Sequence, residues 1–358
     1  MQNIATNNET CGRIVFSSEL AQIIESIIDK LKPDRTFILV DDVTKALCLH
    51  LLPEGLRNRS RTICINHGDE NKNIESMLHV WRELSTHEAT RHSMLFCLGG
   101  GIVTDLGGFA AATFKRGIAC VNFPTTLLAM VDASIGGKTG INLDGLKNEI
   151  GCFSVPHLVV VDTQFLKTLD RPNLLSGYAE MLKHGLLSDK NMWADLLNFD
   201  ICSPDLNRLS MLIERSTQVK QKIVTADPEE HGLRKALNLG HTMGHAFESF
   251  CMLKQKPILH GYAVAYGLVG ELYLSHRLLG LDSTVLEQAL QFIRELYGPF
   301  PITCTHVEEL IELMRHDKKN RAGEINLTLL EAIGQPKLNQ IPGKALITEA
   351  VDFCCDSL

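Results

Sequence analysis

The sequence predicts an α/β fold in which an N-terminal Rossmann-like, nucleotide-binding domain precedes a mainly α-helical domain. Short β-branched runs recur in the first half, and each has the length and composition of a buried parallel strand. These runs are RTFILVDD, RTICINH, SMLFCLGGG, IACVNFP and HLVVVD, at residues 35–42, 61–67, 93–101, 118–124 and 157–162. Amphipathic segments such as NIESMLHVWRELSTH lie between them, which is the alternation of a parallel sheet with helices on both faces.

A change of pattern near Pro172 divides the chain into expected domains at residues 1–172 and 173–358. Beyond this point the strand signals fade and long helical patterns follow, at residues 176–187, 206–224, 237–250 and 261–278. The sequence contains no internal repeat, low-complexity tract or long linker.

Composition limits the partners and the compartment. Of the 358 residues, 45% are hydrophobic and 22% charged, and the net charge of -7 disfavours nucleic-acid and membrane-surface partners, which select basic faces. Eleven scattered cysteines without a CxxC pair indicate reduced thiols. The N-terminus lacks a basic start with an apolar run, and no stretch reaches the roughly 18 apolar residues of a membrane span. We therefore expect a cytoplasmic protein.

The run SMLFCLGGGIVTDLGG leads from an apolar strand through Gly99, Gly100 and Gly101 into a helix. Glycines at such a junction let backbone N–H groups approach a pyrophosphate, although a tight turn without a cofactor is the simpler alternative. Thr104 replaces the third glycine of the GxGxxG spacing. An acidic residue at the end of the 35–42 strand suits ribose hydroxyls, with Asp41 as candidate and Asp42 as the alternative.

The run VNFPTTLLAMVDASIGGKTGINLDGLKNEIG, at residues 121–151, is unusual in its density of glycine and lysine. Its simplest interpretation is a glycine-rich surface loop with solvated lysines. GGKT matches the end of a P-loop, but Asp132 occupies the position of the first glycine, which excludes a nucleoside-triphosphate hydrolase of that type.

The stretch LNLGHTMGHAFES places His241 and His245 on one face of an expected helix. The pair could hold a metal ion or could be polar side chains that line a cleft. Thr242 stands where the HExxH zincins have their glutamate, so that class is excluded.

These motifs occur in a diagnostic order. Together with GGGIVTD, GYAEMLKHG, GLRKALNLGHTMGH and ILHGYAV, the 121–151 run closely resembles the 3-dehydroquinate synthases of the sugar phosphate cyclase superfamily. The resemblance extends from about Asp41 to Gly334.

The resemblance implies one divalent zinc or cobalt ion, held by Glu180, His241 and His260. His245 would then be a proton-transfer group beside the substrate and not a ligand. It also implies NAD, bound by residues from several loops of the first domain: Asp41, Asp69, Lys72, Gly100, Gly101, Asp105, Thr125, Thr126, Lys138, Lys147 and the segment Phe165, Leu166, Lys167 and Thr168. Asp69 departs from the family, which more often has glutamate there.

The implied substrate is 3-deoxy-D-arabino-heptulosonate 7-phosphate, a seven-carbon 2-keto acid. Its phosphate would be bound by Asn148, Lys183, Asn238 and Lys318, with Arg116 supplied by the other subunit of a homodimer. Lys220 and Arg234 would bind the carboxylate, since the guanidinium fork pairs with two oxygens. Asp132 and Lys138 would contact substrate hydroxyls. Tyr262 is a departure, because many relatives have an acidic residue at that position.

The implied reaction is the lyase step of the shikimate pathway that yields 3-dehydroquinate and phosphate, on the route to chorismate and the aromatic amino acids. It combines transient oxidation by NAD, phosphate elimination, reduction and an intramolecular aldol cyclisation. The nearest alternative is a cyclase of the same superfamily that acts on sedoheptulose 7-phosphate, which Arg234 and Lys220 disfavour. A metal-dependent polyol dehydrogenase is a more distant alternative, because the GGKTGIN and KNEIG segments have no purpose in such an enzyme.

Overall fold

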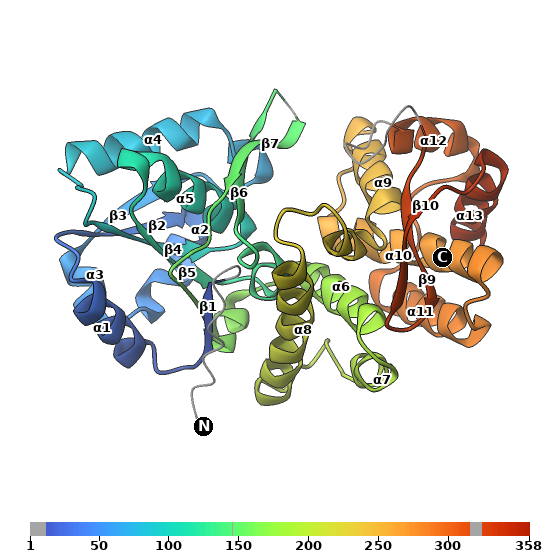
Figure 1. The fold of residues 1–358 in the computed structure, drawn as a ribbon, viewed down its shortest axis with the longest axis horizontal. Helices are drawn as coiled ribbons and strands as arrows, with labels where there is room; N and C mark the ends of the chain where they lie inside the picture. The colour runs from blue at the N-terminus through green and yellow to red at the C-terminus, as the bar shows by residue number, and fades with distance from the viewer. Residues whose placement is uncertain (1–11, 145, 316–323) are drawn as a thin grey trace. The chain divides into compact units, whose positions relative to one another are not determined.

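The computed structural model describes residues 12–144, 146–315 and 324–358. The chain divides into two compact units (Figure 1): the first comprises Met1–Asp170 and Asp205–Thr225, and the second Arg171–Pro204 and Ala226–Leu358. The sequence-based division into residues 1–172 and 173–358 stays a proposal. The compact units differ from it by two residues at the boundary and by helix α8 (Leu206–Ala226), which belongs to the first unit except for its last residue.

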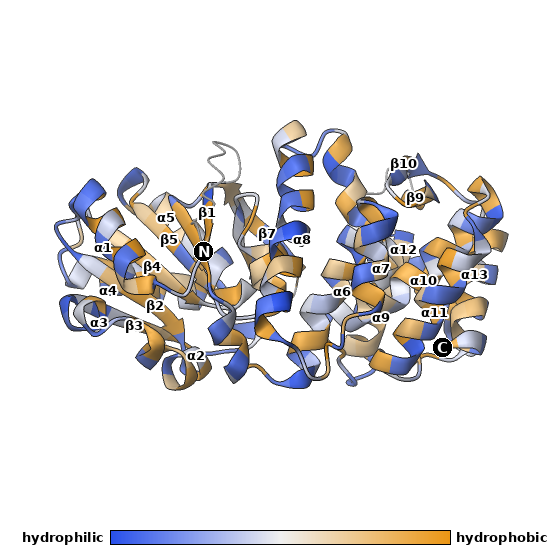
Figure 2. Cartoon of the chain, turned by 90° about the horizontal axis from the view of Figure 1, so that it is seen from below, coloured by the Kyte–Doolittle hydropathy of each residue, from blue (hydrophilic) through white to orange (hydrophobic). Residues whose placement is uncertain are grey.

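A six-stranded parallel sheet forms the centre of the first unit. The strands lie in the order β1 (Arg13–Phe16), β8 (Leu158–Val161), β5 (Ala119–Pro124), β4 (Met94–Gly99), β2 (Thr36–Asp41) and β3 (Ser60–Ile65). Every residue of β2, β4 and β8 is buried, which explains their hydrophobic composition (Figure 2). The five strands expected from the sequence are present, and β1 is an additional edge strand.

Strand order reverses between β2 and β4. From β2 the chain continues to its neighbour β3 on one side, whereas β4, β5 and β8 follow in turn on the other side. In an open parallel sheet, ligands bind beyond the carboxyl ends of the strands at such a switch point. Asp41 ends β2 and Gly99 ends β4, so the acidic residue and the glycine loop flank this position.

Helices α4 (Ile74–Thr86) and α5 (Gly101–Thr113) share a hydrophobic core with one face of the sheet. In α4 the buried residues Met77, Val80 and Leu84 recur at helical spacing. In α5, a Cβ on Gly107 would lie 2.4 Å from the Cys97 sulfur, so glycine is needed for close packing on β4. The remaining helices of the unit include α1 (Leu20–Leu31), α2 (Asp42–Leu47) and α3 (Glu54–Arg59).

The glycine- and lysine-rich run is largely regular structure. A π-helix, η4 (Ala129–Ala133), precedes an antiparallel hairpin of β6 (Lys138–Leu143) and β7 (Leu146–Phe153). A Cβ on Gly140 would lie 2.4 Å from Ile150 O, and one on Gly151 would lie 2.0 Å from Thr139 O. The simple interpretation of this run as a surface loop is therefore wrong, since its glycines allow close strand pairing.

The second unit is mainly helical, as the sequence predicts. Its helices are α6 (Arg171–Leu187), α7 (Lys190–Leu197), α9 (His241–Leu253), α10 (His260–Leu279), α11 (Ser283–Tyr297), α12 (Val307–Arg315) and α13 (Lys344–Ser357). An antiparallel pair, β9 (Leu327–Ala332) and β10 (Gln335–Gln340), has no counterpart in the sequence-based prediction. Among the described residues, no helix combines the length and the apolar character needed to span a membrane.

Helices α6, α9 and α10 approach one another through glycines. A Cβ on Gly261 would lie 1.9 Å from Ser176 O of α6, and one on Gly244 of α9 would lie 2.9 Å from Ala263 O of α10. A Cβ on Gly267 would lie 2.1 Å from Gly240 O. Any larger residue at these positions would push the helix backbones apart.

We expect Gly261→Ala to destabilise the protein by about 3 kcal/mol or more, at the upper end of the usual cost of overpacking, because the obstacle is backbone and cannot change rotamer. Urea unfolding followed by circular dichroism measures the loss. Gly55→Ala is the control, since a Cβ on Gly55 meets nothing within 4 Å. Equal stability of the two variants would contradict the close α6–α10 contact.

Candidate active site

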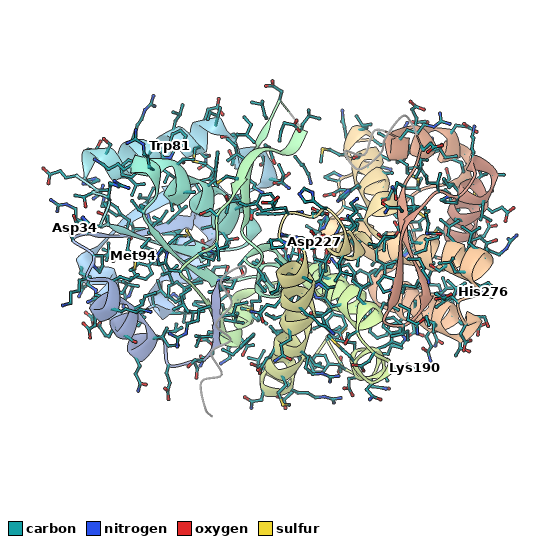
Figure 3. The ribbon with its side chains drawn as sticks, in the orientation of Figure 1. Asp34, Trp81, Met94, Lys190, Asp227 and His276 are labelled. Atoms are coloured by element: carbon teal, nitrogen blue, oxygen red, sulfur yellow. The ribbon has the colours of Figure 1, made fainter. Side chains whose placement is uncertain are left out.

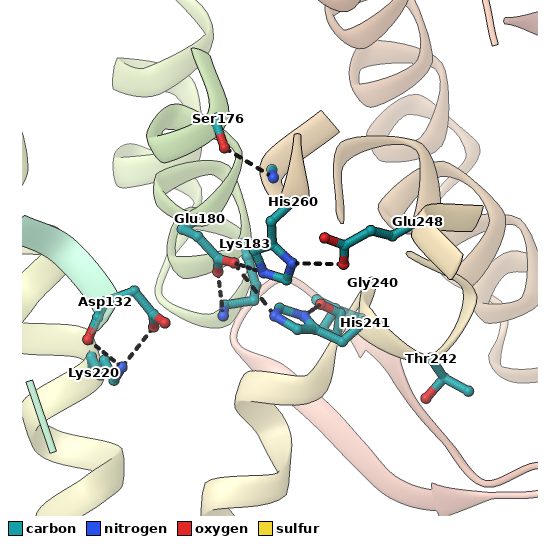
Figure 4. Close-up of polar contacts among 12 residues, drawn as sticks. Asp132, Ser176, Glu180, Lys183, Lys220, Gly240, His241, Thr242, Glu248 and His260 are labelled. Carbon is teal, nitrogen blue, oxygen red and sulfur yellow. Dashed lines mark hydrogen bonds and ion pairs between the residues drawn. The ribbon is translucent and has the colours of Figure 1, made fainter. Parts of the chain in front are cut away.

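Three potential metal ligands converge in the second unit (Figure 4). Glu180 lies within α6, whereas His241 and His260 are the first residues of α9 and α10. Their ligand atoms lie within 4.8 Å of one another. Nε2 of each histidine is 3.4 Å from Glu180 Oε1. The sequence predicts this set from the resemblance, and the structure brings all three residues together.

The Glu180 carboxylate is fully buried and carries a negative charge. Burial opposes its ionisation, but Lys183, with Nζ 2.5 Å from Oε2, and His241 hold the pKa of Glu180 well below its usual range. Burial and Lys183 lower the pKa of His241 to about 4. Burial also opposes protonation of His260, but its interactions with the Glu180 and Glu248 carboxylates outweigh this effect and raise the pKa of His260 to about 10.

Both histidines direct Nε2 toward Glu180 because Nδ1 has another partner. His241 Nδ1 lies 3.1 Å from Leu239 O, and His260 Nδ1 lies 3.3 Å from Glu248 Oε2. Neither Glu180 oxygen has a hydrogen bond of regular geometry to another described residue. Two imidazole nitrogens and a buried carboxylate with spare lone pairs form the donor set of a catalytic zinc or cobalt site. The residues present therefore fit a divalent ion.

His245 lies one turn beyond His241 on α9. Its ring centroid is 5.4 Å from that of His241 and 5.9 Å from that of His260. His245 belongs to neither group of potential metal ligands found among the described residues, whereas His260 belongs to the group with Glu180 and His241. The geometry thus favours His260 over His245 as the second histidine ligand. His245 would lie beside the candidate metal site and would not be a ligand.

The glycine loop and Asp41 form one part of the first unit's candidate nucleotide site. Gly100 is the N-cap of α5 and Gly101 its first residue, and a Cβ on Gly100 would lie 3.0 Å from Thr126 Cγ2. Thr125 N donates to Gly99 O. Asp41 Oδ1 accepts from Thr44 N and Oγ1 at the start of α2, whereas Asp42 pairs with His67 at the surface. Asp41 is thus the buried acidic candidate, and Asp42 the exposed one.

Lys72 connects two other predicted residues. Its buried Nζ donates to Asp105 Oδ2 at 2.5 Å and to Asn148 Oδ1 at 2.6 Å. Burial raises the pKa of Asp105 although Lys72 counteracts the effect. Lys147 lies 3.4 Å from Asp69, and both side chains are partly exposed. Although aspartate is shorter than the glutamate that relatives more often have at this position, the Asp69 carboxylate still reaches Lys147.

Lys220 of α8 is paired with Asp132. Lys220 Nζ donates to Asp132 O at 2.6 Å and to Oδ1 at 2.7 Å. Lys220 is buried, whereas Lys138 at the start of β6 is exposed.

The segment Phe165–Thr168 lies within a 3₁₀ helix, η5 (Thr163–Thr168), whose Phe165 and Leu166 are buried. Arg116 is exposed and has a left-handed φ of 67°.

Arg234 and Asn238 lie on a 3₁₀ helix, η6 (Leu233–Asn238), in the second unit. Gly240, with a left-handed φ of 79°, separates η6 from α9, so the helical pattern expected at residues 237–250 becomes an α-helix only from His241. Arg234 is buried and donates to Pro228 O, while its N–H donates to Asp227, labelled in Figure 3. Asn238 Nδ2 donates to Glu230 Oε1. Lys318 lies outside the described residues.

Glu248 is a residue of the site that the sequence-based reasoning missed. It is buried on α9 and contacts His260. Its spacing is the signal that could have identified it, since Glu248 follows His241 by seven residues and His245 by three and so shares their face of the helix.

A Rossmann-like sheet domain with a helical unit that carries a Glu–His–His cluster defines a class of enzymes that use a dinucleotide together with a divalent metal ion. Comparison with known proteins identifies the family. The models of the 3-dehydroquinate synthase N-terminal and C-terminal domains match residues 62–176 and 177–320. The chain belongs to the 3-dehydroquinate synthase family.

Individual relatives agree with this assignment. The chain is 48% identical over 346 residues to the 3-dehydroquinate synthase of Parabacteroides distasonis, covering 96% of this chain and 98% of that protein. The 2-epi-5-epi-valiolone synthase of Streptomyces hygroscopicus subsp. jinggangensis, solved with NAD⁺ and Zn²⁺, matches with a TM-score of 0.84, 25% identity and 99% coverage of both chains. A 2-deoxy-scyllo-inosose synthase complexed with carbaglucose-6-phosphate, NAD⁺ and Co²⁺ has a TM-score of 0.87 at 21% identity and complete coverage of both chains, which shows the shared fold.

We expect His260→Ala to lose nearly all bound divalent metal, because one of three convergent donors is removed. His245→Ala should keep the metal and lose turnover by roughly 10² to 10⁴, as is typical when an acid or base is removed. Metal content by mass spectrometry and steady-state rates separate the two effects. Metal loss in His245→Ala with retention in His260→Ala would show that His241 and His245 are the ligand pair.

Proposed function

We propose that this chain is a 3-dehydroquinate synthase, which converts 3-deoxy-D-arabino-heptulosonate 7-phosphate to 3-dehydroquinate and phosphate in the shikimate pathway. The observation that carries the proposal is the 48% identity to a 3-dehydroquinate synthase over nearly the full length of both chains. The Glu180, His241 and His260 cluster, which the family resemblance implied, supports it further.

We infer that Glu180, His241 and His260 hold one zinc or cobalt ion and that the first unit binds NAD. When bound, the metal supplies Lewis acidity at substrate hydroxyls, and NAD accepts a hydride and later returns it. For NAD, the proposal uses the switch point between β2 and β4, with Asp41 for ribose and the Gly100–Gly101 backbone for pyrophosphate. The Lys72–Asp105 pair would fix the hairpin beside it through Asn148.

The proposal gives His245 the task of moving the proton of the substrate hydroxyl that is oxidised. Its position beside His241 and His260 supports this role, because a base must lie within hydrogen-bond reach of the reacting group. Lys183 holds a positive charge next to Glu180, where it can bind the substrate phosphate. Exclusion of water around these buried groups keeps reactive intermediates oriented.

The proposal assigns individual residues to the anionic and hydroxyl groups of the substrate. Lys220 and Arg234 are assigned to the carboxylate, Lys183, Asn148, Asn238 and Lys318 to the phosphate, and Asp132 and Lys138 to hydroxyls. Arg116 is assigned to the phosphate of a partner subunit in a cytoplasmic homodimer, and its exposure suits a contact with a second chain. In the structure Lys220 is paired with Asp132. A substrate carboxylate must therefore either contact Lys220 alongside Asp132 or displace Asp132 from it.

NAD should be needed only in catalytic amount, because the hydride leaves the substrate and returns to it. In an assay with the heptulosonate phosphate, phosphate release should exceed the NAD supplied many times over, with no net rise in reduced nicotinamide absorbance. NADH formation in proportion to substrate consumed would instead support a polyol dehydrogenase.

Arg234→Ala should lower kcat/KM for the heptulosonate phosphate at least tenfold. Loss of the partner of a desolvated carboxylate costs on the order of 2 to 5 kcal/mol in binding. NAD and metal affinity should not change, and the neighbouring variant Lys235→Ala should be close to wild type.

The wild-type enzyme should be inactive on sedoheptulose 7-phosphate, which lacks the carboxylate. A silent Arg234→Ala substitution, or better turnover of the carboxylate-free sugar by the wild type, would assign the chain to another cyclase of the superfamily.

A further inference from the structure

The α9 face that carries His241 and His245 continues to a third polar side chain, Glu248. This carboxylate is buried, 8% exposed, although it is not among the three convergent donors. Its Oε2 lies 3.3 Å from Nδ1 of His260, the first residue of the neighbouring helix α10 (Figure 4). A carboxylate is rarely buried unless a partner compensates its charge.

The two histidines are held in the same way by different acceptors. His241 Nδ1 is directed at a backbone carbonyl, Leu239 O, which has no net charge. His260 Nδ1 is directed at the charged Glu248 carboxylate. An acceptor at Nδ1 places the proton there and leaves the Nε2 lone pair free, and a charged acceptor also makes that lone pair more basic.

We propose that Glu248 is a positioning residue that accepts the Nδ1–H of His260 and so directs a basic Nε2 toward the metal beside Glu180. This inference rests on the proposed metal site and adds a residue that the ligand set itself does not include. Glu248 would act only through His260.

The packing of α9 on α10 makes this interaction geometrically stable. Gly244, one turn before Glu248, lies so close to α10 that an added Cβ would be 2.9 Å from Ala263 O. Gly261, next to His260, is fixed in turn against Ser176, because Gly261 N donates to Ser176 Oγ at 3.0 Å. The separation of Glu248 and His260 is thus set by backbone contacts on both sides.

Removal of the Glu248 carboxylate should weaken metal binding while the ligand set stays complete. Glu248→Ala should bind Zn²⁺ or Co²⁺ about 10- to 100-fold more weakly than wild type, the usual cost of losing an outer-shell partner. Glu248→Gln should lose less, because its amide oxygen can still accept the Nδ1–H. Glu248→Asp should restore part of the affinity lost in the alanine variant. Competition between the protein and a chromogenic chelator for the metal alone measures each value.

A matched carboxylate–histidine pair in the same unit provides the control. Glu309 Oε1 lies 2.9 Å from His306 Nδ1 at the surface, away from the three donors. Glu309→Ala should keep the wild-type metal affinity. The NAD affinity of every variant should also be unchanged, because the proposed NAD residues lie in the first unit.

The outcomes separate the two proposals. If His260→Ala abolishes metal binding but Glu248→Ala equals Glu309→Ala, the metal site stands and the positioning role of Glu248 is wrong. If His260→Ala itself retains wild-type affinity, the proposed ligand set is wrong. If Glu248→Ala does not fold, Glu248→Gln decides, because wild-type metal affinity in a Gln variant with normal circular dichroism would overturn the role of the charge.

Discussion

The near-contact of the α9 and α10 backbones is the constraint on which the second unit's site depends. Side chains cannot be accommodated at Gly240, Gly244 and Gly267, where an added Cβ would meet atoms of the facing segment at 3.1 Å or less. Because both helices begin at a histidine, this approach places His241 and His260 together. The contact of Gly261 with Ser176 brings in α6 and, one turn further along, Glu180. The glycines thus determine the geometry of the three candidate ligands without contributing a side chain to the site.

A buried carboxylate completes the start of α9. Glu271 of α10 is fully buried, and it accepts hydrogen bonds from Gly240 N at 2.6 Å, Thr242 N at 3.1 Å and Met243 N at 3.3 Å. The first N–H groups of a helix have no partner within the helix, and a negative charge there is favoured by the helix dipole. Gly240 has no side chain with which to cap the helix, so a glutamate from the neighbouring helix supplies the cap and fixes the position of His241.

The sequence predicted the fold better than the site. Buried strands such as β2 and β4 are recognisable because nearly every residue in them is apolar or β-branched. The switch point between β2 and β4 emerged only with the strand order of the structure. The pair β9–β10 was missed because β10 is mainly polar and alternates exposed with only partly buried residues. From spacing alone His241 and His245 looked like the ligand pair. Only the family resemblance indicated His260. The helices α9 and α10 are separate elements, and the glycines on which their contact depends do not reveal from the sequence which helices they bring together.

Three buried lysines assigned to substrate or cofactor are already paired with carboxylates within their own unit. Lys183 faces Glu180, Lys220 faces Asp132, and Lys72 faces Asp105. A buried lysine without a carboxylate partner would destabilise the fold, so each of these pairs compensates the cost of burying the ammonium group. The same pairing means that an anionic substrate meets nearly neutral clusters in place of a strongly positive surface. Affinity must then come from geometry and from the added divalent charge, which fits a chain with a net charge of -7.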